Sequence, residues 1–171
     1  MTDDHTTHSS AREKLLEHLF VGELMRHLWI SGRRDIELLR SEVDNGSYDL
    51  VLECNGVTRH IQLKASHRGS KTAKVNININ LARRPSGCVV WILFDEDTLQ
   101  LGPYLWFGGA PGEPLPSLGD KIARHTKADA AGLKKERAGL RVVKRAEFQK
   151  LVSLTEVVQA LFGRMHVFSP T

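Results

Sequence analysis

The chain has 171 residues, of which 41% are hydrophobic and 26% charged, a balance that predicts one globular domain with its own core. No apolar run approaches the roughly 20 residues that a membrane-spanning helix needs, and no signal-peptide pattern opens the chain, so we expect a cytoplasmic protein and no membrane partner. The net charge of +4 is mildly basic, which suits a polyanionic partner without identifying one.

The N-terminal segment is polar and then becomes amphipathic. We expect a disordered tail at 1–9 and a single domain at 10–171. Ser10 and Glu13 have the spacing of a capping box, which predicts a long helix from about Ala11 to Ile30 that ends near Ser31-Gly32.

One carboxylate lies within the apolar stripe of this predicted helix. Helical periodicity places Glu17 on the same face as four apolar residues, namely Phe20, Val21, Leu24 and Leu28. A carboxylate in such a stripe costs free energy unless something pairs with it. Glu17 is therefore a candidate site residue, with Glu23 as its rival and a surface ion pair as the plainer interpretation of either.

A weakly alternating segment, 36–43, predicts a first strand, and residues 46–64 predict a β-hairpin. Asn55-Gly56 is a strong signal for a two-residue turn, since a type I′ turn needs positive φ at both positions. Cross-strand partners then have residue numbers that sum to 111, which places Asp49 opposite Gln62. Lys64 projects from the same face as Gln62. The other face is apolar and should pack on a helix; it carries Leu50, Leu52, Ile61 and Leu63.

Asp49, followed by a strand, a turn and Gln62-Leu63-Lys64, resembles the motif of the PD-(D/E)XK nuclease superfamily, which has the restriction-endonuclease-like fold. The motif is an acid at the start of one strand and (Asp/Glu)-x-Lys on the next. Gln62 replaces the second acid and keeps an oxygen ligand without its charge. The resemblance implies an α/β domain in which a long N-terminal helix packs on a mixed, largely antiparallel sheet with a helical C-terminus.

The resemblance also implies a function, a metal-dependent nuclease that hydrolyses phosphodiester bonds in nucleic acid, with DNA favoured. Its catalytic residues would be Glu17, Asp49, Gln62 and Lys64. Mg²⁺ or Mn²⁺ would be held by Asp49, Gln62, the Leu63 carbonyl and Glu17, because oxygen ligands suit these hard cations. Two alternatives stay open: a nuclease-like module that binds nucleic acid or protein without cutting, and a scaffold in which Asp49, Gln62 and Lys64 form a salt-bridge network. A homodimer also stays open as a partner state.

The remaining segments predict further elements. A polar, basic loop is expected at 65–74, and Val75–Asn80 alternates as a strand, where the superfamily usually has a helix. Cys88–Phe94 predicts a buried central strand, and strands are also expected at 99–107 and 140–143. A capping box at Ser153 predicts a C-terminal amphipathic helix. The two cysteines, Cys54 and Cys88, both fall in predicted strands, where buried free thiols are expected.

Basic residues gather in two stretches that can contact nucleic-acid phosphates. The candidates are Arg68, Lys71 and Lys74 in the expected loop and Lys121, Arg124 and Lys127 further along the chain. Charge runs of this kind also occur as ordinary solvated faces, and aromatic residues for base stacking are absent from the second stretch.

Overall fold

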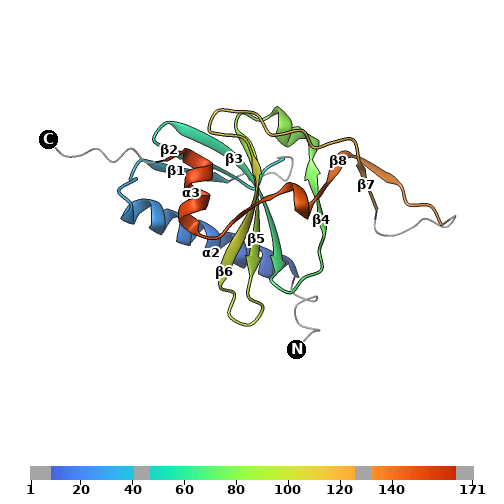
Figure 1. The fold of residues 1–171 in the computed structure, drawn as a ribbon, viewed down its shortest axis with the longest axis horizontal. Helices are drawn as coiled ribbons and strands as arrows, with labels where there is room; N and C mark the ends of the chain where they lie inside the picture. Colours follow the sequence, from blue (N-terminus) through green and yellow to red (C-terminus); the bar gives the residue numbers. More distant parts are fainter. Residues whose placement is uncertain (1–8, 41–46, 126–131, 165–171) are drawn as a thin grey trace.

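The protein is described from a computed structural model, which covers residues 9–40, 47–125 and 132–164. The fold is a mixed α/β domain with a long N-terminal helix, two sheets and a C-terminal helix (Figure 1). A six-stranded sheet has the order β1-β2-β3-β5-β6-β9, and a three-stranded sheet has the order β4-β8-β7. The elements of the large sheet and its helices are α2 (Ser9–Ile30), β1 (Ile36–Arg40), β2 (Leu50–Cys54), β3 (Val57–His67), β5 (Gly87–Phe94), β6 (Leu101–Gly108), β9 (Gln149–Leu151) and α3 (Leu154–Phe162). The small sheet and the 3₁₀ turns comprise β4 (Lys74–Asn78), η1 (Ile79–Arg83), β7 (Ile122–Arg124), β8 (Glu136–Lys144) and η2 (Arg145–Glu147).

The large sheet is mixed and largely antiparallel, as the sequence predicts. β3 and β5 pair in parallel, whereas β1–β2, β2–β3, β5–β6 and β6–β9 pair antiparallel. Every residue of β5 is buried, so the continuous apolar run does form a central strand.

The hairpin that joins β2 and β3 has the predicted register. Cys54 lies opposite Val57 and Leu50 opposite Ile61. The two turn residues, Asn55 and Gly56, have φ values of 52° and 76°, the positive values that the tight turn requires.

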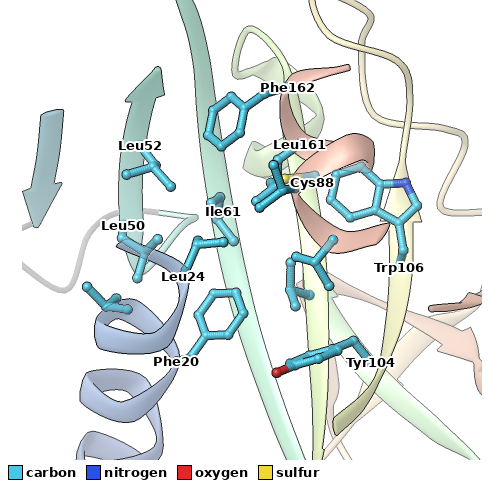
Figure 2. Packing of buried hydrophobic residues seen from close by; sticks show 14 of the residues in the cluster. Phe20, Leu24, Leu50, Leu52, Ile61, Cys88, Tyr104, Trp106, Leu161 and Phe162 are labelled. Atoms are coloured by element: carbon cyan, nitrogen blue, oxygen red, sulfur yellow. The ribbon is translucent and has the colours of Figure 1, made fainter. Parts of the chain in front are cut away.

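Two apolar clusters cover the two faces of the large sheet. On one face α2 and α3 pack against the sheet, where Phe20, Leu24, Ile61, Tyr104 and Leu161 meet (Figure 2). The opposite face packs against the small sheet and the segments around it through a second cluster centred on Trp91. The predicted packing of the hairpin's apolar face on a helix is therefore confirmed.

Of the two predicted N-terminal helix caps, the structure has the one at α3 and not the one at α2. Ser10 lies inside α2, which begins at Ser9, so the prediction of Ser10 as the N-cap is wrong. At α3 the Ser153 side chain accepts a hydrogen bond from the Glu156 amide at 3.3 Å, and the Glu156 carboxylate accepts one from the Val152 amide at 2.7 Å. Gly163, with φ of 78°, ends this helix as expected.

The prediction of a loop at 65–74 is wrong for residues 65–67. β3 continues to His67, because its pairing with β5 extends from His60 to His67 and satisfies the backbone that a loop would leave open. The Trp91 indole also donates a hydrogen bond to the Ser66 hydroxyl at 3.0 Å.

The small sheet differs from the expectation in length and in membership. β4 ends at Asn78, whose side chain accepts a hydrogen bond from the Asn80 amide and caps η1, so Asn80 does not share a strand face with Asn76. β8 begins four residues before the expected Leu140, and β7 and β9 were not predicted. The end of the expected first strand, 41–43, and most of the expected tail lie outside the described residues.

Within the described residues, no helix is long and apolar enough to cross a membrane. Cys54 and Cys88 are buried and free, and burial raises the pKa of the Cys88 thiol to about 12.

Candidate functional site

A cavity of about 420 Å³ lies between the first half of α2 and the open end of the β2–β3 hairpin. β3 is much longer than β2, so among the described residues β3 has no strand partner on its β2 side beyond Ile61, and residues of α2 line the cavity next to this part of β3. The lining side chains that carry charge are Glu13, Lys14, Glu17, Asp49 and Lys64, and Leu63 is also one of the lining residues.

Asp49 directly precedes β2 and extends its ladder. Its backbone amide donates to the Ile61 carbonyl at 2.9 Å, and its carboxylate Oδ2 accepts the Leu63 amide at 2.5 Å. The side chain thus takes the place of the next backbone acceptor of β2, which fixes the carboxylate at the edge of β3 and at the mouth of the cavity.

Burial on the cavity side raises the pKa of Asp49, although the residue as a whole reaches solvent. The Leu63 amide and the Lys64 ammonium oppose this rise, and the negative charge of Glu17 adds to it.

The pKa of Lys64 shifts in the opposite direction. Burial lowers it, the carboxylates of Asp49 and Glu13 oppose the shift, and Arg137 of β8 adds to it. The site thus holds an acid and a base side by side, and protein surroundings disfavour the charged form of each. Oppositely shifted neighbours of this kind gather at functional sites more often than elsewhere.

Glu17 projects from α2 into the cavity, and its side chain is only 10% exposed. Its Oε2 lies 3.0 Å from the Lys14 ammonium and its Oε1 lies 3.2 Å from the Arg40 guanidinium. Both carboxylate oxygens are therefore paired. The rival residue, Glu23, lines a different hollow beside Tyr104.

Gln62 is half-buried on β3 and is not one of the residues that line the cavity. Its amide oxygen Oε1 is buried and has no hydrogen-bond partner within the described part of the chain. A buried polar oxygen without a partner costs free energy, so it is a position where a bound cation or water is expected.

The oxygen atoms of these residues are of the type that binds a hard divalent cation. Carboxylate oxygens of Asp49 and Glu17, the unpartnered amide oxygen of Gln62 and the backbone carbonyl of Leu63 are all oxygen ligands, the type that Mg²⁺ and Mn²⁺ favour. Among the described residues no group of three His, Cys, Asp or Glu side chains gathers in a metal-binding arrangement, so the amide and backbone oxygens would have to complete the ligand set.

The predicted nucleic-acid contacts fall into different surroundings. The Arg68 guanidinium donates to the carbonyls of Gly102 and Gln100 and lies 3.7 Å from the Asp95 carboxylate. Arg124 pairs with Glu136 at 3.5 Å across the small sheet. Three lysines are exposed, namely Lys71, Lys74 and Lys121, while Lys127 lies outside the described residues.

Three basic residues that shape the site, Lys14, Arg40 and Arg137, were not among the site residues predicted from the sequence. Lys14 had a signal, because it lies three positions before Glu17 on the same helix. Arg40 and Arg137 had none, since strand pairing and sheet packing bring them near the cavity from distant parts of the chain.

No protein-family model and no curated protein matches the chain. Among solved structures, it is similar to the bacterial homing endonuclease I-Ssp6803I, with 20% sequence identity, coverage of 66% of this chain and 78% of that one, and a TM-score of 0.27. A TM-score this low carries no argument about the site, which is therefore argued from its own residues.

Proposed function

We propose that the protein is a metal-dependent nuclease of the PD-(D/E)XK type, which hydrolyses phosphodiester bonds in nucleic acid, with DNA favoured as the substrate. The observation that carries the proposal is the convergence of Asp49, Lys64 and Glu17 on one cavity at the open edge of β3. These residue types, in this order along the chain, are those of the motif.

Each residue has a defined task in this proposal. Asp49, Gln62, the Leu63 carbonyl and Glu17 would hold Mg²⁺ or Mn²⁺. When bound, such an ion lowers the pKa of a coordinated water and neutralises charge on the scissile phosphate. Lys64 presents its ammonium in the same cavity, where it would stabilise negative charge on the phosphate oxygens.

The arrangement around Glu17 favours one alternative, a nuclease-like module that binds nucleic acid without cutting. Glu17 already pairs with Lys14 and Arg40, and Gln62 brings no negative charge. A metal ion must therefore displace the Lys14 ammonium or the Arg40 guanidinium before it can bind Glu17.

A cleavage assay separates the two functions. Wild-type protein is incubated with duplex, single-stranded and branched DNA and with RNA, in Mg²⁺ or Mn²⁺, and compared with Asp49→Ala, Lys64→Ala and Glu53→Ala. Glu53 is the control, because its carboxylate lies on the same hairpin, pairs with the Thr58 hydroxyl at 2.8 Å and does not line the cavity.

We expect wild type and Glu53→Ala to cleave at the same rate and the two cavity variants to lose activity. If both Asp49→Ala and Lys64→Ala retain wild-type cleavage, the cavity is not the catalytic site. If wild type cleaves none of the substrates with either metal, the non-cutting module is the better assignment.

A further inference from the structure

A second hollow, of about 940 Å³, lies between segment 68–73, β6, η2 and β9. Five cations line this hollow, which we call the basic groove: Arg68, Lys71, Lys144, Arg145 and Lys150. Its apolar lining comes partly from Leu93, Leu105 and Phe148, and none of the described residues that line it is acidic.

The lysines of the basic groove are short of negative partners. Within the described part of the chain, neither Lys71 nor Lys144 nor Lys150 forms an ion pair. The nearby Glu147 carboxylate accepts the backbone amide of Lys144 at 2.9 Å as part of the η2 turn.

The β4–β8 ladder adds another cation at the same end of the small sheet. Lys74 lies directly opposite Lys144, and like charges that face each other across a ladder are destabilising. An anion bound between these lysines would remove that repulsion.

Arg145 is positioned more rigidly than the lysines. Its guanidinium carbon lies 5.7 Å from the centroid of the Trp91 ring, a cation–π distance, and the side chain is half-buried. Arg68, which also lines the hollow, donates to the carbonyls of Gly102 and Gln100, so we leave it out of the proposed contacts.

The basic groove is linked to the Asp49–Lys64 cavity by a third hollow of about 200 Å³. This hollow shares Glu13, Leu16 and Ala65 with the cavity. It shares Ser70 and Thr72 with the basic groove. The three hollows thus follow one another along the surface from β3 to η2.

We propose that the basic groove binds the phosphate backbone of the nucleic acid that reaches the Asp49–Lys64 cavity. The identity of the polyanion rests on the proposed function, whereas the location rests on the uncompensated lysines and on the shared lining of the hollows. Backbone binding of this kind is independent of sequence and weakens with salt, because each neutralised phosphate releases counterions.

Binding without cleavage tests this directly. A fluorescein-labelled duplex DNA of arbitrary sequence is titrated in EDTA, from about 50 to 200 mM salt, with wild type, Lys144→Glu/Lys150→Glu and Arg26→Glu/Arg34→Glu. The second double variant is the matched control, since Arg26 and Arg34 are exposed, line no part of the basic groove and give the same change in net charge. A milder variant, Lys144→Gln/Lys150→Gln, and thermal unfolding of every variant guard against loss of fold.

We expect the groove variant to bind at least about tenfold more weakly than wild type and its salt slope to fall by about two, with a smaller loss for the glutamine variant and little change for the control. Equal losses in the groove variant and the control would overturn the proposal, as would unchanged affinity and slope in a folded groove variant. Absence of wild-type binding to the duplex, with binding to phosphatidylserine vesicles instead, would also overturn it. Cleavage in Mg²⁺ or Mn²⁺ is measured separately. A negative binding result would therefore overturn this proposal without deciding whether the protein is a nuclease.

Discussion

Replacement of Arg59 by methionine tests how the C-terminal helix is held on the sheet. Arg59 lies on β3, is 0% exposed and has no carboxylate partner among the described residues. Its guanidinium donates to the carbonyls of Leu161 at 2.6 Å and of Ala160 and Gly109 at 2.9 Å. Two of these acceptors belong to the last turn of α3, whose carbonyls have no partner within the helix.

The loss of stability expected for Arg59→Met follows from these hydrogen bonds. Methionine keeps the unbranched apolar stem of the arginine but ends short of the guanidinium position and leaves the three carbonyls unpaired, at about 1–3 kcal/mol each. Removal of the buried charge offsets part of this, because burial itself disfavours the guanidinium and lowers the pKa of Arg59. We expect the free energy of unfolding to fall by about 3–5 kcal/mol, as when one partner of a buried charged network is deleted. For a chain of this size the melting temperature would fall by about 6–20 °C.

Thermal and urea unfolding of Arg59→Met, Arg59→Lys and Arg34→Met measure the effect. Arg59→Lys keeps the charge, but one ammonium group cannot reach all the acceptors, so an intermediate loss is expected. Arg34→Met is the control, since Arg34 is exposed over Trp29 and surface substitutions usually change stability by about 0.5 kcal/mol or less. A loss below about 1 kcal/mol for Arg59→Met would refute the argument that this residue anchors α3.

Three further predictions concern Lys64, Gln62 and Asp49. Lys64→Ala should bind Mn²⁺ with equal or higher affinity in calorimetry, because a nearby positive charge is removed. Its cleavage should slow by about a hundredfold or more. A loss of metal binding in this variant would contradict the role assigned to Lys64. Gln62→Glu restores the acid of the motif, so Mn²⁺ should bind more tightly if the side chain is a ligand; unchanged binding would exclude it. Asp49→Asn should melt at an equal or higher temperature than wild type at neutral pH, because the raised pKa of Asp49 means that its folded-state charge is disfavoured. This advantage should shrink as the pH falls through the folded-state pKa and the aspartate becomes protonated, and a variant that is clearly less stable at neutral pH would contradict the sign of the shift.

Local patterns were sufficient to predict the hairpin. Asn55-Gly56 sets both the turn and the register, because the alternation of apolar residues leaves one register in which Leu50 and Ile61 face the same core. The same reasoning located the buried strand β5 and the capped helix α3, where the signals again lie within a few residues of one another.

Elements that depend on distant partners were not predictable from local patterns. β7 and β9 have three residues each, too few for a period to emerge, and they form because β8 and β6 offer open edges. β8 contains Arg137, Gly139 and Arg141, and such a segment has weak strand propensity of its own. Its pairing with β4 on one side and β7 on the other extends it beyond the apolar core of the segment.

Glu17 shows that contacts between distant parts of the chain, which local patterns do not predict, also determine the chemistry of the candidate site. The helical stripe correctly marked Glu17 as a carboxylate that needs a partner, and Lys14 on the preceding turn is a partner visible in the sequence. Arg40 is not, because it reaches Glu17 from a strand that follows the helix. That contact decides the chemistry available at Glu17, since a carboxylate paired on both oxygens can bind a cation only by releasing a partner. Arg40→Ala should therefore tighten Mn²⁺ binding, since a nearby positive charge is also removed. Glu17→Gln should weaken Mn²⁺ binding strongly if Glu17 is a ligand and change it little if Glu17 only ties α2 to β1, and calorimetry on the two variants distinguishes these roles.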